Sequence, residues 1–239
     1  MHIHVITAFT KTFDGFLHES ILKRAIEKDI VRITLHHIRD YATDKHQQID
    51  DYPYGGGPGM ILKPEPIFAC LEYVREEYGL KETKITLLAP TGQPYGQSKA
   101  IEFSLRDSMI LLCGHYKGLD QRVIDELVDE EISIGDYVLT GGELAAMVII
   151  DSVARLLPGV IGDIDSAITD SFQTGLLDHP HYTRPENFRG HVVPRVLMSG
   201  NHAAIEEWRQ QKALELTKER RDDLYKKYIK NENNSNPSF

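Results

Sequence analysis

The sequence predicts an α/β fold, a parallel sheet flanked by helices, followed by a small and mostly helical C-terminal domain. Over the first two thirds of the chain, short apolar stretches alternate with helical patterns, which is typical of a parallel sheet covered on both faces. This alternation ends at Pro158-Gly159, and no strong strand pattern follows. We therefore expect domains at 1–160 and 176–239, joined by a polar linker at 161–175.

The elements follow from the pattern of apolar residues along the chain. The first three elements are a strand at 3–8, a helix at 15–28 and a second strand, with alternating character, at 31–38. A loop at 41–63 leads to Pro64, which fits the first turn of a helix that we expect to reach residue 78. The alternation continues with strand 84–89, helix 97–105, strand 109–113, helix 119–128, strand 131–134 and helix 142–156. Beyond the linker we expect helices at 201–218 and 222–230 and a disordered tail at 231–239.

Composition restricts the class of protein. The 239 residues are 41% hydrophobic and 26% charged, as in ordinary soluble proteins, and no apolar run is long enough to span a bilayer. The segment from Met1 to Val5 lacks the basic and apolar regions of a secretory signal. Cys70 and Cys113 are far apart, which excludes a disulfide framework and a zinc spacing. We therefore expect a cytoplasmic protein without a membrane partner.

The net charge of −9 argues at first against an RNA partner, but the charge is unevenly distributed. Residues 184–230 carry 11 Lys or Arg and 7 Asp or Glu, a balance of +4. Helices rich in both signs are usually solvated faces. Charge alone therefore favours a solvated surface over a phosphate-binding one.

Four glycine-containing segments are candidates for ligand binding, and three of them follow predicted strands. Ligands of open parallel sheets bind at the carboxyl ends of the strands, where glycine lets the backbone approach closely. Taken alone, 89–96 is better interpreted as a turn, and His115 and Tyr116 in 113–118 as packing residues. Segment 133–143 fits a tight strand-to-helix connection and a backbone-lined pocket for a flat ring equally well. The glycine loop 54–60 is favoured as a loop that closes on a ligand over a plain spacer.

Three charged residues are candidates for catalysis. Arg155, late in an apolar helix, either extends to solvent or points a cation into a site. Asp170 and Asp178 lie in loops, where aspartate is most often a turn former or helix cap. The pair His179 and His181 suggests a metal, but a third ligand at helical spacing is missing. A structural or RNA-contacting role is therefore favoured for the pair, and we expect no metal site.

Together these segments resemble the bacterial tRNA (guanine-N1)-methyltransferases of the knotted SPOUT class, from residue 1 to about 228. The order and spacing of the matching motifs make the resemblance specific. They are Tyr54-Gly-Gly-Gly-Pro-Gly-Met60, Cys113-Gly-His-Tyr-Lys-Gly118, Ser133-Ile-Gly-Asp-Tyr-Val-Leu-Thr-Gly-Gly-Glu143, Asp170-Ser-Phe172, Leu177-Asp-His-Pro-His-Tyr-Thr-Arg-Pro185 and Leu197-Met-Ser-Gly-Asn-His202.

The resemblance implies a deep trefoil knot in the domain 1–160, a tRNA-binding C-terminal domain, and a homodimer whose active sites use both chains. The expected reaction moves a methyl group from S-adenosylmethionine to N1 of guanosine 37, 3′ of the anticodon. The positions implied to bind the donor are Leu88, Pro90, Gly92, Gly114, Tyr116, Ile134, Gly135, Tyr137, Leu139, Gly141 and Gly142. Those implied to contact tRNA are Gly55, Gly56, Gly57, Gly59, Met60, His181, Tyr182, Arg184, Ser199, Asn201 and His202.

The resemblance also assigns roles to the charged residues. Guanine N1 is a poor nucleophile until its proton leaves, and Asp170 matches the family's proposed base. Arg155 matches a cation that stabilises the negative charge growing on O6, and Asp178 would orient the guanine or the base. The family often has glutamate where this chain has Lys117, and that glutamate has been linked to magnesium. A protonated lysine cannot ligate a cation, so either this protein does not use magnesium or other residues ligate it.

Two other functions share parts of this pattern. A knotted 2′-O-ribose methyltransferase would have the donor loops without the aspartate linker as base. A non-catalytic RNA-binding module could keep the donor pocket, although Arg155, Asp170 and Asp178 argue against it. The position of the methyl group on the product distinguishes the two enzymes, and the absence of any transfer to tRNA would indicate the module.

Overall fold

The computed structural model describes residues 1–161 and 170–235. The chain divides into two compact units, Met1–Gly162 and Asp163–Phe239, and each is described by itself. This division falls inside the expected linker 161–175. Among the described residues, no helix is both long and apolar enough to cross a membrane.

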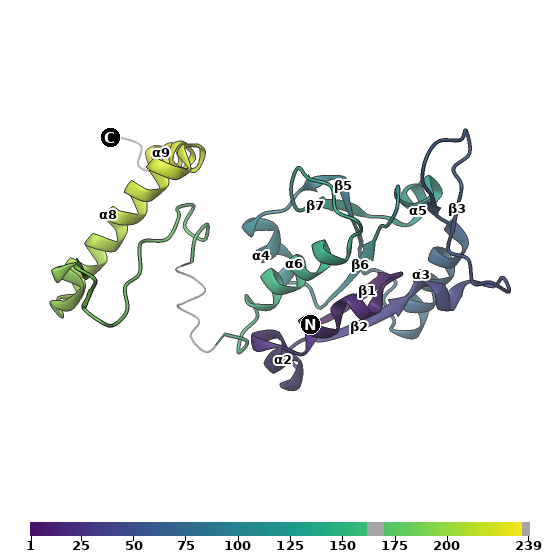
Figure 1. Ribbon diagram of the computed structural model, residues 1–239, viewed down its shortest axis with the longest axis horizontal. Helices are drawn as coiled ribbons and strands as arrows, with labels where there is room; N and C mark the ends of the chain where they lie inside the picture. Colours follow the sequence, from purple (N-terminus) through teal and green to yellow (C-terminus); the bar gives the residue numbers. More distant parts are fainter. Residues whose placement is uncertain (162–169, 236–239) are drawn as a thin grey trace. The chain divides into compact units, whose positions relative to one another are not determined.

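A five-stranded, fully parallel sheet forms the centre of the first unit (Figure 1). Its strands lie in the order β2-β1-β6-β5-β7, so the chain crosses over the sheet repeatedly. The apolar runs explain this placement, since β1 and β6 lie inside the sheet and are buried over nearly their whole length. The predicted parallel α/β sheet is confirmed. The strands are β1 (His2–Thr7), β2 (Arg32–His37), β5 (Ile85–Pro94), β6 (Ser108–Cys113) and β7 (Glu130–Ser133).

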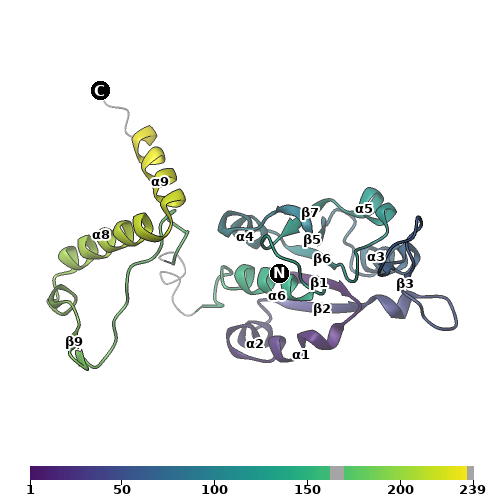
Figure 2. The same ribbon diagram turned by 45° about the horizontal axis from the view of Figure 1, so that its top comes forward.

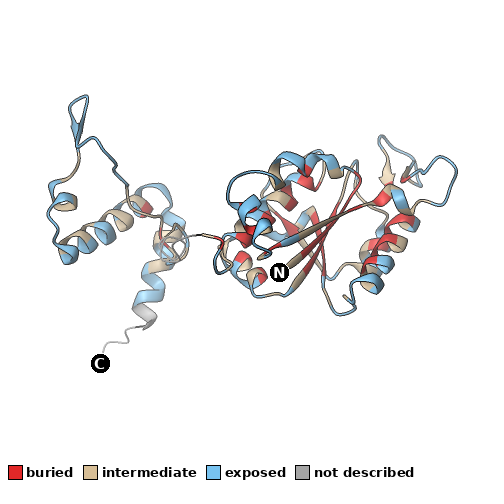
Figure 3. Ribbon diagram, turned by 90° about the horizontal axis from the view of Figure 1, so that it is seen from below, coloured by how far each residue is buried: buried red, intermediate tan, exposed pale blue. Residues whose placement is uncertain are grey.

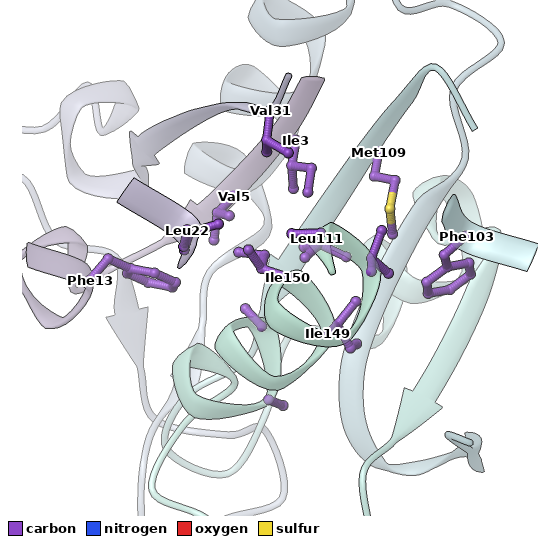
Figure 4. Packing of buried hydrophobic residues seen from close by; sticks show 14 of the residues in the cluster. Ile3, Val5, Phe13, Leu22, Val31, Phe103, Met109, Leu111, Ile149 and Ile150 are labelled. Atoms are coloured by element: carbon purple, nitrogen blue, oxygen red, sulfur yellow. The ribbon is translucent and has the colours of Figure 1, made fainter. Parts of the chain in front are cut away.

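Helices cover both faces of this sheet (Figure 2). On one face, α6 (Glu143–Ala154) packs with α2 (Ser20–Glu27) and α4 (Gln97–Ser104) against alternate residues of β1 and β6. Figure 4 shows Ile149 and Ile150 of α6 in this cluster. On the other face, α3 (Pro64–Glu77) and α5 (Gln121–Leu127) bury the intervening residues. The two clusters fix the strand ends on which the candidate site is built.

Several local predictions need correction. The helix expected at 15–28 is a 3-10 turn (Thr10–Phe13), a short α1 (Asp14–Leu17) and then α2, with Ser20 at a φ of 55° where α2 begins. The expected strand 84–89 continues to Pro94, because residues 93–94 pair with β7 again after an irregularity. The expected loop 41–63 begins at the last residue of a 3-10 helix (Ile38–Tyr41). It also contains the two-residue strands β3 (Asp50–Asp51) and β4 (Ile61–Leu62), which pair antiparallel.

The second unit contains the two expected helices, α8 (His202–Arg220) and α9 (Asp222–Ser235). It also has a small hairpin of β8 (Asn187–Phe188) and β9 (His191–Val192), which the sequence pattern did not predict, and a 3-10 turn at Arg195–Met198. The tail prediction is wrong for residues 231–235, since α9 includes them; 236–239 lie outside the described residues.

Burial differs sharply between the two units (Figure 3). The first unit has a continuous buried core, whereas in the second unit the only buried residues among those described are Leu176 and Thr217. Side chains such as Phe188 and Val192 are more than half exposed. A unit that buries so little apolar surface gains little stability from its own core.

Candidate functional site

A cavity of about 260 Å³ opens beside the middle of β5 and at the carboxyl ends of β6 and β7. Its walls come mainly from residues 88–90 of β5 and from the segments 114–119 and 132–142. Exposed backbone of glycine-rich loops gives such a cavity many amide and carbonyl groups close to a ligand. Ten of the eleven residues predicted to bind a methyl donor line it together: Leu88, Pro90, Gly114, Tyr116, Ile134, Gly135, Tyr137, Leu139, Gly141 and Gly142.

Gly92 is the predicted donor-binding residue that does not line this cavity. A Cβ at Gly92 would lie 2.3 Å from the backbone nitrogen of Ile132, inside van der Waals contact. Its backbone therefore packs directly on strand β7, at the irregularity where Ile132 pairs with both Leu88 and Gln93. The structure accounts for this glycine by strand packing.

Two of the cavity loops are tied together by their backbones. The Gly142 N–H donates a hydrogen bond to the Gly114 carbonyl at 2.8 Å, and His115 forms an isolated antiparallel bridge with Gly141. A Cβ on Gly142 would stand 2.8 Å from the Cα of Cys113, so only glycine fits this contact without displacing backbone. This contact between the two loops determines the shape of the cavity, because both loops form part of the cavity wall.

A buried carboxylate lies behind this crossing. Glu143, the first residue of α6, is 5% exposed, and its Oε1 accepts a hydrogen bond from Thr7 Oγ1 at 2.6 Å. Its Oε2 is 3.9 Å from Nδ1 of His115. Burial first, and the Glu143 charge second, raise the pKa of the Cys113 thiol. Neither Glu143 nor Thr7 was singled out from the sequence, where an acid at a helix start resembles an ordinary first-turn residue.

The glycine loop 54–60 reaches the cavity at its C-terminal end. The Lys117 N–H donates to the Met60 carbonyl at 3.0 Å, and the stem of Lys117 crosses Gly59, where a Cβ would lie 2.8 Å from Cγ of the lysine. Lys117 itself lines the cavity. The preceding glycines Gly55, Gly56 and Gly57 have positive φ angles and no neighbouring atom around a built Cβ. The predicted substrate loop is therefore anchored beside the cavity, with an open tip.

In the second unit, a hydrogen bond joins Asp178 to the residue that follows Asp170. Ser171 follows Asp170, and its Oγ accepts a hydrogen bond from the Asp178 N–H at 2.9 Å. The Asp178 carboxylate accepts from the His179 N–H at 2.7 Å and contacts His181 Nε2 at 2.8 Å. Asp178 is thus a fixed acceptor that orients its own loop. Arg155, at the C-terminus of α6, belongs to the first unit, whereas the two aspartates belong to the second.

Asp178, His179 and His181 also place one potential metal-ligand atom each within 4.8 Å of one another. A carboxylate and two imidazoles would suit a first-row transition metal. The short hydrogen bond between Asp178 and His181 is complete without an ion, however. We therefore assign no metal to this group.

Of the remaining residues predicted to contact tRNA, Ser199, Asn201 and His202 lie at the start of α8, whereas the others precede the β8–β9 hairpin. The Asn201 side chain caps this helix by accepting from the Ala204 N–H at 3.2 Å, and the Ser199 hydroxyl accepts from the Asn201 N–H. His202 and Arg184 are exposed. Tyr182, half exposed, has its ring 6.4 Å from that of Trp208. Asn201 and Ser199 thus have a structural role in the chain itself.

The fold and the cavity indicate the class of protein. They are typical of an open parallel α/β protein that binds a small ligand in glycine loops at the carboxyl edge of its sheet. Comparison with known proteins specifies it further. Residues 1–227 match the family model described as tRNA (Guanine-1)-methyltransferase TrmD. The chain therefore belongs to the TrmD family of tRNA (guanine-N1)-methyltransferases and is an enzyme of that class.

Individual relatives agree over nearly their whole length. The chain is 55% identical over 228 residues to the tRNA (guanine-N(1)-)-methyltransferase of Anoxybacillus flavithermus, which covers 95% of this chain and 93% of the relative. It is 49% identical over 227 residues to the protein of the same name from Clostridioides difficile, covering 95% and 98%. The Listeria innocua protein of that name is 51% identical over 228 residues, covering 95% and 93%. These findings confirm the resemblance deduced from the motifs.

Proposed function

We propose that this enzyme transfers the methyl group of S-adenosylmethionine to N1 of guanosine 37, immediately 3′ of the anticodon in tRNA. Membership of the family supports the tRNA guanine-N1 specificity. The observation that carries the proposal is the gathering of ten predicted donor-binding residues from three separate segments around one cavity. Their separation in sequence makes such convergence improbable for plain turn residues.

The cavity suits the proposed donor in its chemistry. Leu88, Ile134 and Leu139 offer apolar contacts for a flat adenine ring, while the glycine loops present backbone groups for its polar edge. When bound, the sulfonium supplies a methyl group that is already activated for displacement. The residues of the cavity would therefore orient the donor and exclude water around the transferred group.

Asp170 is the proposed general base, which takes the N1 proton of guanine. Its neighbour Ser171 is tied to the backbone of Asp178, and the Asp178 carboxylate is in turn held by His181. These hydrogen bonds support a role for Asp178 in positioning the loop that presents Asp170. A base placed in this way contributes on the order of 10²–10⁴ in rate.

Arg155 is the proposed cation for the negative charge that develops on O6 as the N1 proton leaves. As the C-cap of α6, Arg155 puts a positive charge at the carbonyl end of a helix, which stabilises both. A fixed cation at a developing oxyanion contributes about 3–4 kcal/mol. The glycine loop 54–60 and the residues His181, Tyr182, Arg184 and His202 are proposed to contact the tRNA.

Two features support a homodimer in which each active site uses both chains. On α6, Leu144 and Val148 are about half exposed although the helix is apolar nearly all round, and a helix of that kind is normally covered. Arg155 lies seven residues beyond Val148, on the same side of the helix. The second unit also lacks a core of its own among its described residues, which favours packing against another surface.

We further propose that the first unit is knotted, with the segment leading into α6 passing through the loop that precedes β6. The backbone crossing of Gly142 over Gly114 and the packing of Gly92 against β7 support a threaded arrangement. Lys117 in the cavity wall argues against a magnesium ion held at that position. A cytoplasmic location fits the tRNA substrate and the two buried free thiols.

Replacement of Asp170 tests the catalytic assignment. We expect Asp170→Asn to reduce single-turnover methyl transfer at saturating donor and tRNA by about 10²-fold or more, while S-adenosylhomocysteine binds as tightly as to the wild type. Arg155→Ala should lower turnover more than it weakens tRNA binding. Near-full turnover of Asp170→Asn would show that another group removes the proton.

A further inference from the structure

Three polar side chains from three different elements meet behind the cavity. Thr7 ends β1, His115 follows β6, and Glu143 begins α6. The Thr7 hydroxyl donates to Glu143 at 2.6 Å and accepts from the Phe9 N–H at 2.9 Å. The Phe9 ring packs on the His115 imidazole, with 4.4 Å between centroids, and His115 Nδ1 lies 3.9 Å from Glu143. The contacts form a closed circuit of four residues.

We propose that Glu143 is a positioning residue for the methyl donor, acting through His115 on the two loops that cross at the cavity wall. This inference rests on the proposed donor site and assigns it a support that does not touch the donor. His115 and Gly141 are cavity wall, and they are joined by a backbone bridge. The Glu143 carboxylate lies directly beneath that bridge.

Gly141 reveals how closely these groups are packed. A Cβ on Gly141 would lie within 2.5 Å of both Oε2 of Glu143 and Nδ1 of His115. Gly141 therefore faces the gap between the carboxylate and the imidazole, and any side chain at this position would displace one of them. A displacement of His115 would disturb this part of the wall, because its backbone is bridged to that of Gly141.

The buried charge of Glu143 requires groups around it that compensate the cost of its burial. A carboxylate buried to this extent is costly unless it is hydrogen-bonded or faces positive charge. Thr7 supplies one hydrogen bond, and the start of α6 supplies the positive end of a helix dipole. His115 Nδ1 is buried without a hydrogen-bond partner among the described residues, and Oε2 of Glu143 is the acidic atom that faces it. In the tautomer with its proton on Nδ1, the imidazole is attracted to Oε2, which holds His115, and with it residues 114–118, against Gly141.

Glu143→Gln tests this role because it keeps the shape of the side chain and its bond from Thr7, but removes the charge. Binding of S-adenosylhomocysteine, the demethylated donor, is measured by isothermal titration calorimetry. We expect its dissociation constant to rise roughly tenfold, as for the loss of one charged interaction. Turnover at saturating donor should stay within about threefold of the wild type, so that the effect appears in the KM for the donor.

A second variant and a control separate positioning from general stability. In the His115→Ala background, Glu143→Gln should change donor affinity by less than about twofold, because the partner is already absent. Glu130→Gln is the matched control: Glu130 is a largely buried carboxylate of β7, held by Thr86, Lys99 and Arg106, and it does not line the cavity. It should lower the unfolding temperature without changing donor affinity.

Unchanged affinity of Glu143→Gln for S-adenosylhomocysteine would overturn the proposal, as would an equal loss of affinity in the Glu130→Gln control. Additive effects of the His115 and Glu143 substitutions would also overturn it. Failure of the wild-type protein to bind S-adenosylhomocysteine would instead overturn the proposed donor cavity itself. The two failures are therefore distinguishable in a single titration series.

Discussion

Substitution of Gly92 tests whether this residue serves the donor or the sheet. In Gly92→Ala the new methyl group would stand 2.3 Å from the Ile132 nitrogen and 2.5 Å from the Glu131 carbonyl carbon, both backbone atoms of β7. Ordinary van der Waals contact would require a separation about 1 Å larger, so strand β7 or the irregularity in β5 has to move. Overpacking of this kind costs about 1–3 kcal/mol, which lowers the unfolding temperature of a chain this long by about 3–10 °C.

The assay is thermal unfolding followed by circular dichroism, with Gly96→Ala as the matched control. Gly96 lies just after β5, has an ordinary negative φ of −154°, and has no atom within 4 Å of a built Cβ. Gly96 is the N-cap of α4, where alanine is less favourable than glycine, so we expect the control to lose about 0.5–1 kcal/mol and to be less destabilised than Gly92→Ala. Equal unfolding temperatures for the two variants, with weaker donor binding in Gly92→Ala alone, would refute the packing explanation.

Three further predictions follow from charge and exposure. Burial lowers the pKa of His4 to about 3 and that of His36 to about 4, so between these values and pH 6.5 the unfolded chain binds more protons than the folded chain. The free energy of unfolding should therefore fall as the pH drops below 6.5, by up to about 1.4 kcal/mol per pH unit for each group. Equal free energies from urea unfolding at pH 7 and pH 5 would contradict this. The double variant Leu144→Glu, Val148→Glu should sediment as a monomer, whereas Leu105→Glu, at an even more exposed leucine outside α6, should not change the sedimentation of the wild type. Methyl transfer should proceed at an unchanged rate in excess EDTA, since Lys117 stands in the cavity wall, and its abolition by the chelator with recovery on adding magnesium would show that other ligands bind the ion.

Much of the first unit could be predicted from the sequence because its strands are apolar and its connections short. Strand β6 is buried at five of its six residues, so its apolar run was sufficient to place it. The break in the helix expected at 15–28 could not be foreseen, because Ser20 adopts a left-handed φ that its local sequence does not favour. The continuation of β5 to Pro94 was also hidden. Proline and glycine indicate a turn locally, and pairing with β7 overrides that preference.

The site was predictable to the extent that its residues lie in distinctive motifs. Glycine loops could be placed at strand ends, and the structure brings ten of their predicted donor-binding residues to one cavity. Glu143 ends the motif 133–143, but the local sequence does not indicate its role, because its hydrogen-bond partner Thr7 is 136 residues away in the sequence. Contacts between such distant positions follow from the order of the strands, which local patterns do not specify.

The proposed transfer to N1 of guanosine 37 is tested most directly by locating the methyl group. Purified enzyme is incubated with unmodified tRNA and S-adenosylmethionine carrying a labelled methyl group, and the product is digested and analysed by nucleoside mass spectrometry. We predict labelled 1-methylguanosine in the fragment that contains the anticodon loop. Label recovered on a ribose 2′-oxygen or on another base, or no label in any tRNA, would contradict the account.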